Sequence, residues 1–138
     1  MEMRDHVQQE IEELHQFFQD WYNGVLPQTN EAFARFADAM ASGFTIIFPS
    51  GNVMRREPLV EALYKSYDGR DGFRIWIKNV QIHQKVGDVI VASYQEWQRD
   101  QEQTTARLSS VILERDSNAP NGLRWLHVHE TWLPNEHP

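Results

Sequence analysis

Apolar residues recur at steps of three and four positions along the first part of the chain, which is the spacing of one face of an α-helix. The stripe consists of Val7, Ile11, Leu14, Phe18, Trp21 and Val25. It predicts a helix of about five turns that buries this face. Gly24 and Pro27 are typical of a helix end, so we expect the helix to stop there.

Two shorter helices and a strand are predicted next. Asn30 is a suitable N-cap for a second helix, whose buried face would consist of Phe33, Phe36, Ala37 and Met40. Residues 44–48 lie between two turn signals and predict a short strand. Pro58 suits the first position of a third helix, with Leu59, Leu63 and Tyr67 facing inward.

From residue 73 onward the pattern changes to that of β-strands. The segment 73–86 is long and β-rich, and its apolar parity slips near Lys78 and Asn79, which predicts a bulge or a bend. A hairpin signal at 87–88 leads into a strand at 89–98, and further strands are predicted at 106–115 and 123–133. Three helices followed by a meander of long antiparallel strands predict an α+β fold.

The predicted strands carry apolar residues on both faces. The strand 89–98 has Ile90, Ala92 and Tyr94 on one face and Val89, Val91 and Trp97 on the other. In the last strand, strict alternation separates Leu126, Val128 and Trp132 from Trp125, His127, His129 and Thr131. A sheet with helices on one side should be polar on the other unless that side is covered. We therefore expect a homodimer through the sheet face, against the alternative that scattered exposed apolar residues need no partner.

Composition limits the classes of function. The chain has 138 residues, and we predict a single domain over residues 1–138. The absence of cysteine excludes disulfides, thiolate nucleophiles and cysteine-ligated zinc. A net charge of −7 argues against binding to a nucleic acid, which requires a basic surface. The polar start of the chain does not resemble a signal peptide, and apolar runs are too short to span a membrane, so we expect a cytoplasmic protein without a membrane partner.

Two segments carry a resemblance to a known family. The strand and turn at Phe44–Gly51 resemble an F-x-x-x-x-P-x-G element, and "NGLRWLHVHET" resembles a closing G-x-W-x-x-x-H strand. Together with the order of elements from Val7 to Leu133, they are similar to the nuclear-transport-factor-2-like superfamily. That superfamily includes SnoaL-like polyketide cyclases, ketosteroid isomerase, scytalone dehydratase and the association domain of calcium/calmodulin-dependent kinase. The resemblance implies a strongly curved mixed or antiparallel sheet that forms a cone-shaped half-barrel around an internal pocket.

The resemblance also implies where functional side chains lie. The pocket floor would come from inward-facing residues of the long strands, with His129 at the position of the family's first closing-strand histidine. Thr131 stands where many members have a second histidine. Phe48 precedes the turn proline where ketosteroid isomerase carries its aspartate base, and a phenyl ring cannot accept a proton. The isomerase reaction is therefore not expected by that route.

The two histidines of "HVHE" are the first candidates for chemistry. His127 and His129 share one strand face, as in some histidine metal sites. Glu130 points to the opposite face and cannot complete a ligand set, so we predict no metal site and no cofactor.

A carboxylate and an arginine on neighbouring strands are the second candidates. Glu96, Arg107 and His129 would converge on one face of the meander, where Glu96 and His129 could act as an acid–base pair. The alternative interpretation is that Glu96 and Arg107 form an ion pair that anchors two strands.

Aromatic side chains complete the predicted pocket. The ligand-binding set consists of Arg107, His127, Tyr94, Trp21, Tyr22, Phe48 and Thr131. Aromatic walls with a few polar groups are typical of a small-molecule site. The leading hypothesis is a SnoaL-like domain that binds a small, partly apolar molecule. The alternatives are a lyase or isomerase that uses His129 and Glu96, and an oligomerisation module similar to the kinase association domain.

Overall fold

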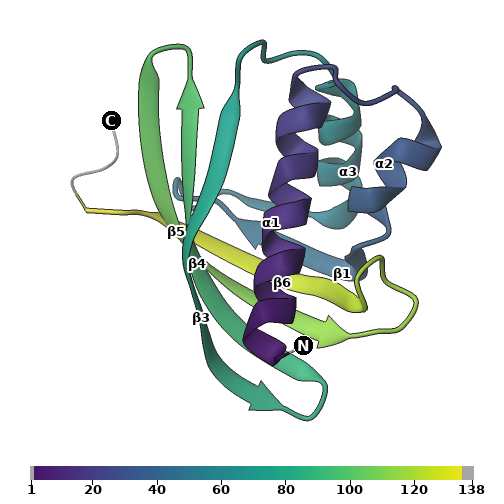
Figure 1. Cartoon of the computed structure of the whole chain (residues 1–138), viewed down its shortest axis with the longest axis vertical. Helices are drawn as coiled ribbons and strands as arrows, with labels where there is room; N and C mark the ends of the chain where they lie inside the picture. The colour runs from purple at the N-terminus through teal and green to yellow at the C-terminus, as the bar shows by residue number, and fades with distance from the viewer. Residues whose placement is uncertain (1, 135–138) are drawn as a thin grey trace.

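The computed structural model describes residues 2–134; Met1 and residues 135–138 of the expected domain lie outside the described part (Figure 1). Over the described residues the chain forms three helices and one open six-stranded sheet, as predicted for an α+β fold. The helices are α1 (Met3–Tyr22), α2 (Asn30–Ala37) and α3 (Arg56–Lys65). The strands are β1 (Met40–Ile47), β2 (Val53–Arg55), β3 (Arg74–Val86), β4 (Val89–Asp100), β5 (Gln103–Arg115) and β6 (Leu123–Trp132).

The sheet is mixed and curves around the first helix. Its strand order is β2-β1-β6-β5-β4-β3, in which β1 and β6 run parallel and the other neighbours run antiparallel. Helix α1 lies along one face of the sheet, α2 contacts α1, and α3 contacts β1 (Figure 1). The core therefore sits between α1 and the inner face of the sheet, which is the face toward this helix.

The predicted helices form, with small changes at their ends. On α1, Val7, Ile11, Leu14 and Trp21 of the predicted stripe are buried and Phe18 is half-buried, but Val25 lies beyond the helix and is 69% exposed. The helix ends at Tyr22, before Gly24 adopts a left-handed conformation with φ of +69°. The N-cap of α2 is Thr29 rather than Asn30, since the Thr29 hydroxyl accepts a hydrogen bond from Ala32 N at 3.1 Å. Met40, expected on this helix, is instead the first residue of β1.

The long hairpin follows the predicted pattern. The register of β3 against β4 shifts between Lys78 and Gln81, where Asn79 has φ of +56°, so the predicted bulge is confirmed. Val86 pairs with Val89 across the two-residue turn that contains Gly87. The parity predicted for the inner face of β4 is also confirmed, because Ile90, Ala92 and Tyr94 are buried.

Strand β6 contains a bulge that strict alternation did not predict. Ile112 of β5 pairs with His127, but the next residue, Leu113, pairs with Trp125, so Leu126 is an extra residue. The bulge reverses the parity of everything after it. Trp125, Val128 and Glu130 consequently share the inner, buried face of the sheet.

A buried carboxylate ties α1 to the rest of the fold. Glu10 is completely buried, and its Oε1 accepts hydrogen bonds from Arg35 Nη2 at 2.7 Å and Asn121 Nδ2 at 2.9 Å. Its Oε2 accepts a hydrogen bond from Trp125 Nε1 at 2.8 Å. Because a buried charge is tolerated only when it is paired, this cluster fixes α1 against α2 and β6.

Candidate functional site

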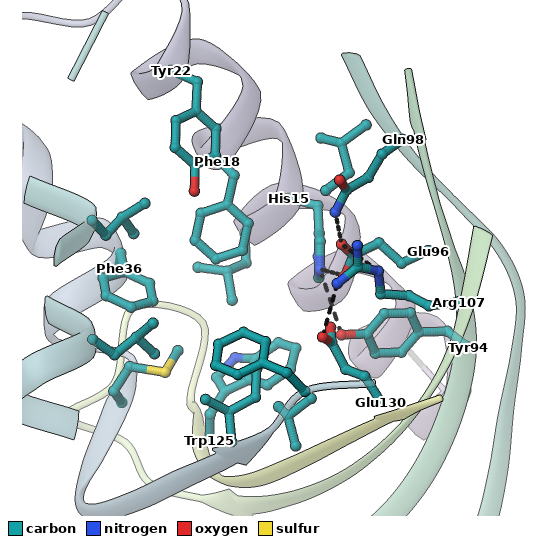
Figure 2. A pocket seen from close by; sticks show the side chains of 18 of the residues that line it. His15, Phe18, Tyr22, Phe36, Tyr94, Glu96, Gln98, Arg107, Trp125 and Glu130 are labelled. Atoms are coloured by element: carbon teal, nitrogen blue, oxygen red, sulfur yellow. Dashed lines mark hydrogen bonds and ion pairs between the residues drawn. The ribbon is translucent and has the colours of Figure 1, made fainter. Parts of the chain in front are cut away.

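A cavity of about 300 Å³ opens between α1 and the inner face of the sheet (Figure 2). Most of its wall is aromatic or aliphatic. These residues are Leu14, Phe18, Phe36, Met40, Phe44, Ile46, Phe48, Leu59, Leu63, Phe73, Ile75, Trp125 and Val128. The polar part of the wall consists of His15, Tyr22, Arg70, Tyr94, Glu96, Gln98, Arg107 and Glu130.

The register of three strands brings the polar residues together. Glu96 of β4 pairs with Arg107 of β5, so their side chains lie next to each other on the inner face. Two residues along the strands, and therefore on the same face, Tyr94 pairs with Ser109, and Ser109 in turn pairs with Glu130 of β6. The polar cluster is therefore built on rigid strands rather than on loops.

His15 reaches the cluster from α1. Its Nδ1 lies 2.7 Å from the carbonyl oxygen of Ile11, and its Nε2 lies 3.1 Å from Glu96 Oε1. Both neighbours are acceptors, so both ring nitrogens carry a proton and the imidazole is positively charged. Burial alone would lower the pKa of His15, but the hydrogen bond and the charge of Glu96 outweigh it and raise the pKa.

Glu96 is the anionic centre of the cluster. Burial opposes its ionisation, but the contact with His15 and the charge of Arg107 outweigh this effect and lower the pKa of Glu96. Its second oxygen, Oε2, accepts a hydrogen bond from Gln98 Nε2 at 2.6 Å. Glu96 thus remains a carboxylate held between α1 and two strands.

Glu130 has the opposite environment. Its Oε1 accepts one hydrogen bond, from Arg107 Nη1 at 3.0 Å, and its side chain is only 6% exposed. Burial, together with the nearby charge of Glu96, raises the pKa of Glu130 to about 7 in spite of Arg107. The two carboxyl groups of the pocket therefore differ in charge near neutral pH.

Arg107 is held on two sides but is not saturated with hydrogen bonds. Its guanidinium lies 4.9 Å from the centre of the Trp132 ring, a cation–π contact. Its Nε is buried and lies 4.0 Å from Glu96 Oε2, and no residue in 2–134 accepts a hydrogen bond from it. Arg107 thus carries a donor that is available to a further acceptor.

The structure places five of the predicted site residues on the pocket wall. These are Tyr22, Phe48, Tyr94, Glu96 and Arg107. Tyr94 is completely buried, burial raises its pKa well above the usual value, and its hydroxyl lies 3.5 Å from His15 Nε2. The lining position of these residues agrees with the prediction, while their roles stay predictions.

The remaining four predicted residues lie elsewhere. Trp21 is completely buried in the core, where its Nε1 donates to the carbonyl oxygen of Leu63 at 2.8 Å. His127, His129 and Thr131 lie on the face of the sheet away from α1, because the bulge at Leu126 reverses the parity. His127 Nδ1 lies 2.8 Å from Thr45 Oγ1 on that face. The expected convergence of His129 on Glu96 is therefore wrong.

Four polar lining residues were not predicted as part of the site: His15, Arg70, Gln98 and Glu130. A signal for His15 was present, since it follows Leu14 and lies four residues after Ile11, on the apolar side of α1. Gln98 lies two residues after Glu96 and shares its face. Glu130 was correctly separated from the two histidines, but the pocket was assigned to the wrong side of the strand.

In the part of the chain from 2 to 134, no group of three or more histidine, aspartate or glutamate side chains is arranged to hold a metal ion. Across the same residues, none of the helices has the length and apolar character needed to cross a membrane.

An open mixed sheet wrapped around one long helix, with a pocket between them, defines an NTF2-like protein. The structure of an NTF2-like protein of unknown function from Pseudomonas aeruginosa agrees with this class. It superposes with a TM-score of 0.83 at 28% identity, and the match covers 93% of this chain and 98% of that one. A CaMKII hub from S. rosetta has the same fold, with a TM-score of 0.62 at 12% identity over 87% of this chain and 94% of that one.

Within this class, the chain belongs to the sucrose-6-phosphate phosphohydrolase C-terminal family, whose model matches residues 7–134. The chain is 26% identical to sucrose-phosphatase 1 from Nicotiana tabacum over 127 residues, which is 90% of this chain. It spans about 30% of the length of that relative.

Proposed function

We propose that the chain binds a small, partly apolar molecule in the cavity between α1 and the sheet. The supporting observation is a cavity of about 300 Å³ whose aromatic and aliphatic wall is interrupted by a few buried polar groups. This volume lies at the lower end of the usual range for ligand pockets, which favours a compact ring compound over an extended one.

A variant that fills the cavity tests this function. Leu59 lines the pocket from α3 and is half-buried, so Leu59→Trp would occupy its space without replacing a fully buried residue. Glu61 is exposed on the same helix, and Glu61→Trp is the matched control. Calorimetric titration with 2-naphthol should detect binding to the wild type and to Glu61→Trp, and no binding to Leu59→Trp. Equal binding to all three proteins would refute the pocket as the site.

The names of the relatives suggest a sugar phosphate as an alternative ligand. A sugar presents hydroxyl groups on all sides and needs many hydrogen-bond partners, whereas most of this wall is apolar. We therefore infer a partly apolar ligand, and sucrose 6-phosphate is the comparison ligand in the same titration. Tighter binding of sucrose 6-phosphate than of 2-naphthol would reverse this preference.

A homodimer through the outer face of the sheet is a second proposal. On that face the rings of Trp76 and Trp97 stack with their centres 6.3 Å apart, and Leu108 is 36% exposed. Apolar residues on an exposed sheet are typical of an interface. Sedimentation velocity should give a dimer for the wild type and a monomer for Leu108→Glu, while Val86→Glu, at the exposed end of β3 beside the β3–β4 turn, should stay dimeric. A monomeric wild type at micromolar concentration would contradict the proposal.

A further inference from the structure

The wall of the pocket is divided between two kinds of chemistry. Phe18 and Phe36 lie on one side of the cavity, while Glu96, Arg107 and Glu130 lie on the other (Figure 2). A ligand that fills the cavity would therefore contact aromatic rings at one end and ionisable groups at the other. Such a division selects a molecule that is itself apolar at one end and polar at the other.

Pairing of the charges in the wall leaves one incomplete pair. His15 is paired with Glu96 at 3.1 Å, and Arg70 is paired with Asp100 at 2.7 Å. Arg107 donates a hydrogen bond to Glu130 through Nη1, while its buried Nε lies 4.0 Å from Glu96 Oε2 and has no hydrogen-bond acceptor among residues 2–134. A buried guanidinium normally binds its anion through two nitrogens, so Arg107 has capacity for a second acceptor.

Glu130, the carboxylate paired with Arg107, is readily protonated near neutral pH. The charged and titratable groups around Glu130 are His15 from α1, Tyr94 and Glu96 from β4, and Arg107 from β5. Burial and the charge of Glu96 raise the pKa of Glu130 to about 7. Protonation of Glu130 near neutral pH therefore costs little free energy, and it turns this carboxyl group into a hydrogen-bond donor.

Protonation of Glu130 leaves the pocket with an excess of positive charge at Arg107. The pair of His15 with Glu96 stays neutral overall, and Arg70 keeps the carboxylate of Asp100. One singly charged anion would restore the balance. A cationic ligand would instead meet three cationic side chains on the wall, since His15, Arg70 and Arg107 all line it.

We propose that the ligand of this pocket is an organic monocarboxylate with a ring, bound with its carboxylate at Arg107 and Glu130 and its ring against Phe18 and Phe36. The inference rests on the binding function proposed above and names the class of ligand. Each carboxylate that binds to the ionised fraction of the protein takes one proton from the buffer, and that proton resides on Glu130. The protonated Glu130 donates a hydrogen bond to the ligand, and Arg107 donates the others.

A pair of isosteric probes separates charge from shape. We would titrate the full chain with 2-naphthoate and with 2-naphthamide by calorimetry at pH 6, 7 and 8, each in two buffers of different ionisation enthalpy. The carboxylate should bind at least about tenfold more tightly than the amide at pH 6, since a buried charge-assisted pair discriminates by this factor or more. Its affinity should fall by about fivefold between pH 7 and pH 8, with proton uptake visible in the difference between buffers. The affinity of the amide should not depend on pH.

Two variants test the named residues. Glu130→Gln carries a permanent neutral donor, so it should bind 2-naphthoate with an affinity that no longer depends on pH. Arg107→Gln should lose the preference for the carboxylate, while Arg99→Gln, an exposed position on β4, should behave as the wild type. Because Glu130→Gln reproduces the size and the neutral charge of the protonated Glu130 side chain, it tests the inference independently of the folding of Arg107→Gln.

The outcomes distinguish the inference from the function on which it rests. If 2-naphthamide binds as tightly as 2-naphthoate, or if Glu130→Gln keeps the pH dependence, the carboxylate class is wrong while the pocket function stands. If neither probe binds to the wild type, the binding function itself fails, and the inference fails with it. Selective binding of the carboxylate that depends on Arg107 and on the protonation of Glu130 supports both.

Discussion

Replacement of Glu130 by glutamine should remove a specific pH dependence of stability. The pKa of Glu130 is raised from 4.5 to about 7 by burial and by the charge of Glu96. Below pH 4.5 this carboxyl is protonated in both the folded and the unfolded chain. Between pH 4.5 and 7 the folded chain holds one proton more than the unfolded chain, so the free energy of unfolding decreases as the pH rises.

The magnitude follows from the size of the shift. One pKa unit corresponds to about 1.4 kcal/mol, so a shift of about 2.5 units corresponds to about 3 kcal/mol. The Glu130 side chain is only 6% exposed, so solvent screening reduces this value little. From pH 5 to pH 8 the wild type should lose about 2 to 3 kcal/mol of stability through this group.

Urea unfolding followed by tryptophan fluorescence at pH 5, 6, 7 and 8 measures the effect. The free energy of the wild type minus that of Glu130→Gln should fall steadily over this range and level off above the folded pKa. Glu102 is exposed in the turn between β4 and β5, so Glu102→Gln should leave the pH profile of the wild type unchanged. A difference between wild type and Glu130→Gln that is constant within 0.5 kcal/mol, a threshold set at about the usual effect of a surface substitution, would refute the assigned environment of Glu130.

Three further substitutions test the framework by urea unfolding. Glu10→Gln should cost about 3 kcal/mol because it removes a fully buried carboxylate from its pair with Arg35, whereas Glu12→Gln on the exposed side of α1 should cost less than about 0.5 kcal/mol. Equal losses would contradict the role of the buried carboxylate. Asn79→Val should lower the free energy of unfolding by about 1–2 kcal/mol because the φ of this residue is +56°, whereas Asn79→Gly should not. An Asn79→Val variant as stable as the wild type would argue against the bulge. His15→Phe should cost about 3 kcal/mol because it removes the cation that is hydrogen-bonded to the buried Glu96, and His15→Phe/Glu96→Leu should recover most of this loss. A double variant that is no more stable than His15→Phe would contradict the role of the pair in stability.

Local patterns were sufficient to predict most of the fold. Apolar spacing located α1, and a parity slip located the bulge at Asn79, because both signals lie within a single element. Strand β2 was missed because three residues are too few to show a period. The parallel pairing of β1 with β6 joins segments far apart in the chain. Neither the pairing nor its register can be predicted from the residues of either segment alone.

The site was predicted less well than the fold because it depends on contacts between elements. Glu96 and Arg107 were found, since both lie on adjacent antiparallel strands in a register that a hairpin fixes. The partner of Glu96 was assigned to β6, whereas it is His15 of α1. The error came from the assumption of strict alternation along β6, which one additional residue was enough to break.

The extra residue at Leu126 also affects how related sequences should be aligned. Trp125 on one side of the bulge is fixed in the core, and Glu130 on the other side faces the pocket. A relative that lacks one residue at this point could form a regular strand and still present the same side chains to the cavity. An alignment that places the gap elsewhere in β6 would instead match pocket residues with those of the outer face. Comparison of pockets across the family therefore requires that a single-residue gap be allowed inside this strand.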